Sequence, residues 1–120
     1  MRVLVIDDDV YFLGMVRAAL EEDGHVVATA TDGGSGLVSA ARQSPDAIIL
    51  DIRMPVADGA WFARAYERQP GRHAPIIVIS GYTTGQVAPI GTAIAHLTKP
   101  FELDELRGVL ERVRQAAPPS

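Results

Sequence analysis

The sequence predicts an α/β fold, a doubly wound five-stranded parallel sheet with helices on both faces. The first observation behind this prediction is a set of short apolar runs without polar alternation, at residues 3–6, 47–50 and 76–79. Such runs are typical of strands that are buried on both faces. The second observation is that stretches with helical spacing of apolar residues separate these runs. Strands that alternate with helices in this way favour a parallel sheet.

The N-terminal elements have clear boundaries. We expect a strand over residues 2–7 and a helix over residues 10–22, with Asp9 as the helix cap and Gly24 at its end. The apolar stripe of this helix includes Phe12, Leu13, Val16 and Leu20. A second strand is expected over residues 25–30.

The middle of the chain repeats this pattern. Asp32 opens a second helix, which stops before Pro45 because proline cannot continue a helix. The third strand is expected over residues 46–51. Asp58 is the expected cap of a third helix, which ends before Pro70.

Two strands and a helix complete the expected fold. The strands cover residues 76–80 and 94–98, and the last helix covers residues 102–114. Acidic residues lead this helix and arginines trail it, as the helix dipole prefers. The intervening residues 81–93 contain three glycines and one proline, which disfavour a helix interior. We therefore expect the helix between the fourth and fifth strands to be shortened or lost.

The composition is that of one domain, expected at residues 1–115, with residues 116–120 as a tail or the start of a linker. The 120 residues are 48% hydrophobic, which is enough for a single core. No apolar run approaches the roughly 20 residues of a membrane span, and the lack of cysteine excludes disulfides and thiolate metal sites. The net charge of -4 argues against nucleic-acid binding. We expect a cytoplasmic protein that binds neither nucleic acid nor membrane directly.

Acidic residues follow two strands that we expect to be neighbours. With the strand order 2-1-3-4-5, the first and third strands are adjacent and the switch point of the sheet lies between them. This order brings Asp7, Asp8 and Asp51 to one edge, where like charges repel unless a cation lies among them. We expect Mg²⁺ rather than Ca²⁺, because few protein ligands plus water and a phosphate suit magnesium.

A hydroxyl and an ammonium are expected at the same edge. Ser80 closes the fourth strand, and Lys99, the one lysine among 11 basic residues, follows the fifth. Arginine cannot mimic the compact ammonium of lysine at a tight site, which favours a functional role for Lys99. A carboxylate beside Mg²⁺ can attack phosphorus and become an acyl phosphate. The metal and Lys99 would then neutralise the transferring oxygens, and Ser80 would hydrogen-bond the product.

These residues resemble the receiver domain of two-component response regulators, and the resemblance covers essentially the whole chain. The motifs that carry it are Asp7-Asp8 after the first strand, Asp51 with Met54-Pro55 after the third, Ser80 after the fourth and Lys99-Pro100 after the fifth. The resemblance implies a flavodoxin-like fold and a phosphorylation-controlled relay or switch rather than a turnover enzyme.

The resemblance also implies which residues bind the phosphoryl group and the metal. Asp51 is the implied phosphoacceptor. Asp8 is the implied direct ligand of Mg²⁺, Asp7 helps through water, and the backbone carbonyl of Arg53 is a further ligand. The implied donor is a phosphohistidine on a sensor histidine kinase or a histidine phosphotransfer protein. The output partner stays unknown, and a homodimer stays open.

By the same resemblance, Lys99 contacts the phosphoryl group, Ser80 is the switch hydroxyl, and the Lys99-Pro100 bond is cis. His96 stands three residues before Lys99, where the family often has a tyrosine or phenylalanine that swings inward on activation. It is either such a rotamer switch or simply a polar strand residue. Gly81 departs from the alanine that more often follows the switch residue, and it would leave more room near the phosphate.

Two other functions compete with the relay. A haloacid-dehalogenase-like phosphatase also forms an aspartyl phosphate, but the second aspartate that such enzymes carry two residues after the nucleophile is Arg53 here. A degenerate receiver domain would act as an unphosphorylated interaction module. The complete acidic set, together with Lys99, counts against that alternative.

Overall fold

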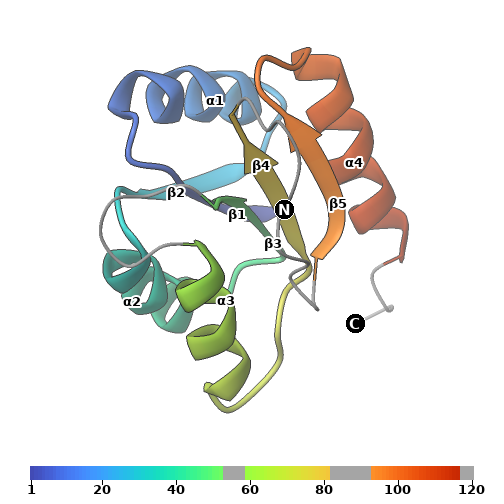
Figure 1. Ribbon diagram of the computed structural model, residues 1–120. Helices are drawn as coiled ribbons and strands as arrows, with labels where there is room; N and C mark the ends of the chain where they lie inside the picture. The colour runs from blue at the N-terminus through green and yellow to red at the C-terminus, as the bar shows by residue number, and fades with distance from the viewer. Residues whose placement is uncertain (53–58, 82–92, 117–120) are drawn as a thin grey trace.

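The computed structural model describes residues 1–52, 59–81 and 93–116. Its strands are β1 (Arg2–Ile6), β2 (Val26–Ala30), β3 (Ala47–Asp51), β4 (Ile76–Ser80) and β5 (Ala93–Thr98). Its described helices are α1 (Val10–Glu22), α2 (Gly33–Gln43), α3 (Gly59–Arg68) and α4 (Leu103–Ala116). All neighbouring strands pair in parallel, in the order β2-β1-β3-β4-β5, and helices lie on both sides of the sheet (Figure 1). The predicted doubly wound sheet and its strand order are confirmed.

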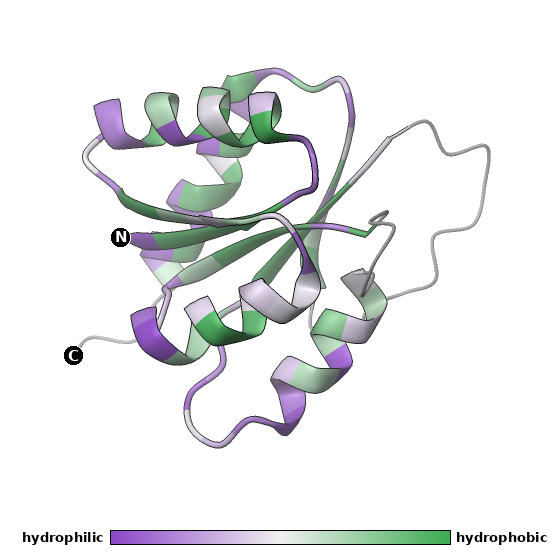
Figure 2. Ribbon diagram, turned by 90° about the vertical axis from the view of Figure 1, so that its left-hand side faces the viewer, coloured by the Kyte–Doolittle hydropathy of each residue, from purple (hydrophilic) through white to green (hydrophobic). Residues whose placement is uncertain are grey.

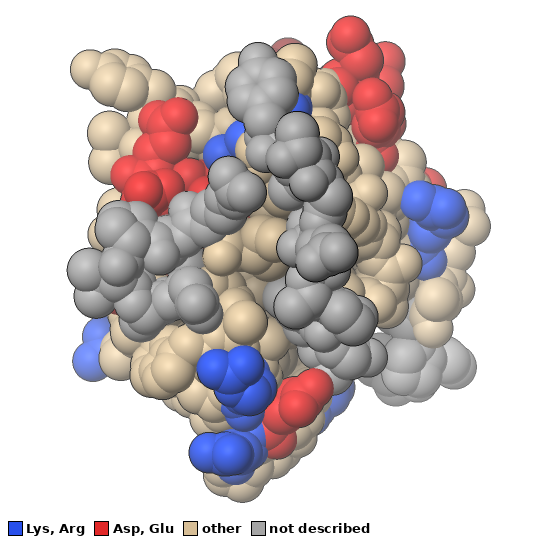
Figure 3. Space-filling model, viewed as in Figure 1, with Lys and Arg blue, Asp and Glu red and all other residues tan. Residues whose placement is uncertain are grey.

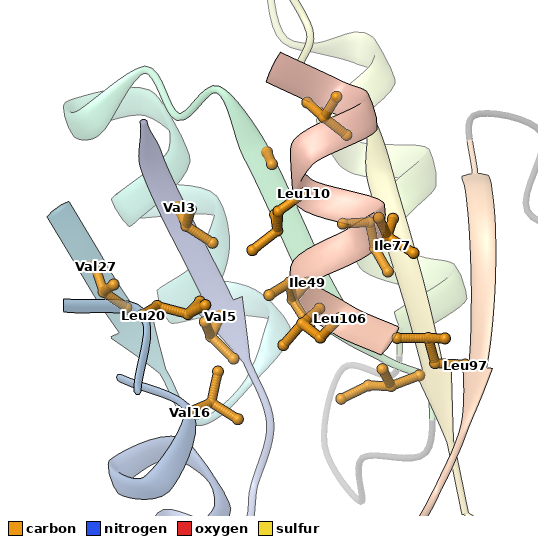
Figure 4. Packing of buried hydrophobic residues seen from close by; sticks show 14 of the residues in the cluster. Val3, Val5, Val16, Leu20, Val27, Ile49, Ile77, Leu97, Leu106 and Leu110 are labelled. Carbon is orange, nitrogen blue, oxygen red and sulfur yellow. The ribbon is translucent and has the colours of Figure 1, made fainter. Parts of the chain in front are cut away.

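Two apolar cores lie on opposite faces of the sheet, because successive strand residues point to opposite sides. Val5, Ile49 and Ile77 belong to the core under α1 and α4, which Figure 4 shows with Leu20, Leu106 and Leu110. The alternate strand residues belong to the second core, with α2 and α3: Leu4, Ile6, Ile48, Leu50, Ile76 and Val78. In Figure 2 the hydrophobic strands accordingly lie between helices that carry hydrophilic stretches. Every residue of β3 and β4 is buried, as the unbroken apolar runs predict.

Aspartate caps begin the first two helices. The side chain of Asp9 accepts hydrogen bonds from the backbone N–H groups of Tyr11 and Phe12, and that of Asp32 accepts one from Ser35. Gly24 follows α1 with φ of 93°, a left-handed conformation that glycine adopts without strain. These three predicted boundaries are confirmed. The predicted cap Asp58 lies outside the described residues.

The element ends differ from the predicted ones by a residue or two, where strand pairing decides the boundary. β2 begins at Val26, opposite Arg2 of β1, and β5 begins at Ala93, opposite Ile76 of β4. α4 extends to Ala116. The division of the chain into a domain at residues 1–115 and a tail or linker stays a prediction.

The helix labelled α4 follows β5, so it is not the helix that the sequence predicts to be shortened. That prediction concerns residues 81–93, of which 82–92 lie outside the described residues. None of the helices in the described parts of the chain combines the length and the apolar character that a membrane crossing requires.

Candidate functional site

Three carboxylates meet at the carboxyl edge of the sheet. Asp51 is the last residue of β3, and Asp7 and Asp8 directly follow β1. β1 and β3 are hydrogen-bonded neighbours, with Ile6 opposite Leu50, so both strands deliver their acidic residues to the same place. One carboxylate oxygen from each of the three lies within 4.8 Å of the others. The strand order therefore produces the acidic cluster that the sequence predicts.

The three carboxylates differ in their surroundings. Asp7 has no exposed surface and Asp51 is 5% exposed, whereas Asp8 is open to solvent. Asp7 accepts hydrogen bonds from the backbone N–H of Asp9, at 2.9 Å, and from Lys99 Nζ, at 2.6 Å. Such charge-assisted hydrogen bonds offset the cost of burying a carboxylate.

Lys99 brings the ammonium to this cluster. Its Nζ lies 2.6 Å from Asp7 Oδ2 and 4.0 Å from Asp51 Oδ2. Its backbone N–H donates to the carbonyl oxygen of Ser80, at 2.6 Å, and the bond from Lys99 to Pro100 is cis, as predicted. The end of β5 thus holds Lys99 within ion-pair distance of two carboxylates.

The hydroxyl of Ser80 is buried next to an imidazole. Ser80 ends β4 with no exposed surface, and its Oγ lies 2.9 Å from Nε2 of His96. His96 is exposed on β5, where it pairs with Val78, two residues before Ser80. The sequence places His96 near the switch position but does not predict this hydrogen bond. Only the pairing of β4 with β5 could have revealed it.

Two further predictions about the site concern Gly81, which follows Ser80, and Arg53, which lies two residues after Asp51. A Cβ built on Gly81 would meet no atom of the described residues within 4 Å, which agrees with the expectation of extra room beside Ser80. Arg53, the expected carbonyl ligand, lies outside the described residues.

The cluster of Asp7, Asp8 and Asp51 fits a hard divalent cation. Carboxylate oxygens are the ligands that such cations prefer, and the three here can converge on one point. The single ammonium of Lys99 leaves an excess of negative charge among the carboxylates. The chemistry of the site therefore matches a bound cation better than a neutral ligand.

The sequence predicts Phe12 only as part of the apolar stripe of the first helix. In the structure its ring centroid lies 4.1 Å from Lys99 Nζ, and the ring of Phe101 packs edge-on against it, with centroids 6.0 Å apart. These side chains line an open cavity of about 420 Å³ that also includes Met15 and Gly81. In the sequence, the sign of an aromatic contact near Lys99 is Phe101, which directly follows Lys99-Pro100.

Charge is unevenly distributed over the face drawn in Figure 3. The two main groups of acidic side chains lie in the upper half of this face, and the basic side chains are scattered over it in small groups. On the part of this face that described residues cover, the basic groups form no continuous patch of the kind that binds nucleic-acid backbones.

The family model of the response regulator receiver domain matches residues 3–111. The transcriptional regulatory protein PrrA of Mycobacterium tuberculosis is 43% identical to this chain over 108 residues, which cover 88% of this chain and 46% of PrrA. The chain spans about half the length of the curated relatives it matches.

Solved structures show the same similarity. The receiver domain of NtrX from Brucella abortus is 29% identical, with a TM-score of 0.81, over 96% of this chain and 99% of that one. The chemotaxis response regulator CheY4 of Vibrio cholerae is 33% identical, with a TM-score of 0.80, over 93% of this chain and 97% of that one.

Proposed function

Because the chain belongs to the response regulator receiver domain family, we propose that it takes up a phosphoryl group on Asp51 and thereby changes its binding to partner proteins. One observation carries this proposal. The carboxylates of Asp7, Asp8 and Asp51 lie within 4.8 Å of one another, and the ammonium of Lys99 lies 4.0 Å from Asp51. A nucleophile, a cation site and a positive group for phosphoryl oxygens are thus together.

Asp51 is the best nucleophile of the three carboxylates. Asp7 has no exposed surface, so its carboxylate is the least accessible of the three to a phosphoryl donor. Asp8 is exposed, whereas Asp51 is nearly buried at the end of β3. A carboxylate oxygen of Asp51 attacks the donor phosphorus, and the bond from phosphorus to the donor breaks with its electron pair leaving on the donor.

The metal of this proposal is Mg²⁺, with Asp8 and Asp51 as direct ligands, Asp7 acting through water and the backbone carbonyl of Arg53 as a further ligand. When bound, Mg²⁺ supplies positive charge against the phosphoryl oxygens. Lys99 supplies the second positive charge from its position near Asp51.

Ser80 and His96 form the proposed switch. In the unphosphorylated chain the hydroxyl of Ser80 lies 2.9 Å from the imidazole of His96. A phosphoryl group on Asp51 offers Ser80 a stronger, charged acceptor, so the hydroxyl turns toward it and releases His96. Because His96 is exposed on β5, its release changes the surface that partners meet.

The proposed donor is a phosphohistidine on a sensor histidine kinase or a histidine phosphotransfer protein, and the proposed location is the cytoplasm, where such a donor would meet the chain. The output partner stays open, as does a homodimer. The chain promotes its own phosphorylation and dephosphorylation, and we do not propose a turnover enzyme.

Incubation with acetyl phosphate and Mg²⁺, followed by intact-mass measurement, tests the assignment of Asp51. We expect one added phosphoryl group on the wild type and none on Asp51→Asn. Asp9→Asn is the matched control, because asparagine also caps helices and this variant should still be modified.

An adduct that persists in Asp51→Asn would refute the assignment. Continuous turnover of acetyl phosphate would favour the phosphatase alternative, and a wild type that never reacts would favour the unphosphorylated module.

A further inference from the structure

We propose that Phe12 is a positioning residue for Lys99, whose ring face holds the ammonium beside the two carboxylates that it must serve. This inference rests on the proposed function, in which Lys99 meets the phosphoryl group on Asp51. It adds an uncharged aromatic side chain from α1 to the carboxylates, the ammonium and the hydroxyl of the proposed site.

The contact has the geometry of a cation–π interaction. Lys99 Nζ lies 4.1 Å from the centroid of the Phe12 ring, well inside the roughly 6 Å within which the negative ring face attracts a cation. The lysine side chain is only 25% exposed, and Phe12 is half-buried. Partial exclusion of water strengthens such an attraction.

Such a contact matters because the two carboxylate partners attract the ammonium with different strengths, and the nearer one is not the proposed phosphoacceptor. Asp7 lies at 2.6 Å from Nζ and Asp51 at 4.0 Å, and the four-carbon stem of lysine is flexible. Another carboxylate would hold the ammonium by a direct ion pair and compete with the phosphoryl group. The ring attracts Lys99 without forming such a pair, so it holds the ammonium in the site and leaves it available to a phosphoryl group on Asp51.

The position of Phe12 is set by a hydrogen bond of its backbone and by a neighbouring ring. The backbone N–H of Phe12 donates to the capping carboxylate of Asp9, at 3.2 Å, which fixes the first turn of α1. The ring of Phe101, two residues after Lys99, packs edge-on against Phe12 at an interplanar angle of 82°. The fixed backbone and the packed ring of Phe101 together limit how far the Phe12 ring can turn away from the ammonium.

The single lysine of the chain makes the contact directly measurable. With isotope-labelled lysine, NMR of the metal-free, unphosphorylated protein reports the side chain of Lys99 alone. We expect its side-chain proton signals to be shifted upfield by the ring current of Phe12. Phe12→Leu should remove this shift and Phe12→Tyr should keep it. Tyr11→Leu is the matched control, since it deletes an aromatic ring of the same turn that is 87% exposed.

The same variants test the effect on phosphorylation. Phe12→Leu should slow modification by acetyl phosphate about two- to thirtyfold, the range that one cation–π contact spans. Phe12→Tyr should react within about twofold of the wild type. Tyr11→Leu should react like the wild type, because a small donor needs no contact with that exposed residue.

Unshifted lysine signals in the unphosphorylated wild type would overturn this inference alone, provided that acetyl phosphate does modify Asp51 of the same protein. So would a Phe12→Leu protein that loses the shift but reacts at the wild-type rate. A wild type that takes up no phosphoryl group on Asp51 would overturn the proposed function, and this inference with it.

Discussion

Asp46 shows how one carboxylate joins segments that are distant in the sequence. It precedes β3, at the edge of the sheet opposite the acidic site. Its Oδ2 accepts a hydrogen bond from the backbone N–H of Arg2, at 2.8 Å, and its Oδ1 accepts one from the Arg72 guanidinium, at 3.0 Å. The hydrogen bond from Arg2, helped by Arg72, lowers the pKa of Asp46 below its usual value, although partial burial opposes this effect.

A lowered pKa in the folded state means that ionised Asp46 stabilises the fold. This contribution is fully present above the ordinary carboxyl pKa of about 4 and is lost as the pH falls through the lowered pKa. We expect Asp46→Asn to reduce the free energy of unfolding by up to about 1 kcal/mol near neutral pH, because the side chain is 40% exposed and solvent screens its charge.

Urea unfolding from about pH 7 down to about pH 3 measures the difference between wild type and Asp46→Asn. The difference between the two free energies of unfolding should shrink toward zero as the pH falls. The exposed Glu22→Gln variant controls for the loss of one negative charge. A difference that stays constant or widens toward acid would contradict the assignment.

At the scale of elements, the start of α3 lies directly against the end of β3. A Cβ on Gly59 would lie 2.6 Å from Ile52 Cα and 2.8 Å from the carbonyl oxygen of Asp51. Both are backbone atoms, which cannot turn aside as the end of a flexible side chain can. Glycine therefore lets the helix approach the strand end that carries the proposed phosphoacceptor.

We expect Gly59→Ala to lower the free energy of unfolding by about 1–3 kcal/mol, since the helix must move away from β3. Gly108→Ala is the matched control. Gly108 lies inside α4, and a Cβ there would meet no described atom within 4 Å. The free energy of unfolding of this control should instead rise by about 0.5–1 kcal/mol, because alanine has a higher helix propensity than glycine. Urea unfolding of the two variants measures these changes. A Gly59→Ala protein as stable as the wild type would contradict a close backbone contact at Gly59.

At the scale of the whole molecule, the carboxylates that would bind a cation lower the stability of the metal-free fold. Three carboxylates gather around one ammonium, so their repulsion is only partly neutralised without metal. We expect Asp8→Asn to raise the melting temperature of the metal-free protein by about 1–3 °C, a modest gain because Asp8 is exposed. Mg²⁺ should stabilise the wild type more than this variant, by mass action.

Thermal melts with and without Mg²⁺, together with calorimetric titration, provide the measurement. Glu22→Gln removes the same charge away from the site and should respond to Mg²⁺ like the wild type. A wild-type melt that ignores about 10 mM Mg²⁺, with no binding heat, would count against a magnesium site.

The sequence by itself determined the described strands and helices, the caps of α1 and α2, and the edge at which the acidic residues meet. Apolar periodicity is a local signal, and the capping preferences of Asp9 and Asp32 act within one turn of a helix. The parallel order of the sheet then sends the ends of β1, β3, β4 and β5 to one edge. Asp7, Asp51, Ser80 and Lys99 could be brought together on these grounds alone.

Only the tertiary structure decided which side chains touch within that edge. The hydrogen bond between Ser80 and His96 depends on the pairing of β4 with β5, and the contact of Lys99 with Phe12 depends on where the first turn of α1 meets the segment that follows β5. The close approach of Gly59 to Asp51 depends on where α3 meets the sheet. Each contact joins elements that form separately, and a shift of one residue or one rotamer would change the partner. Local patterns in the sequence carry no record of such distances.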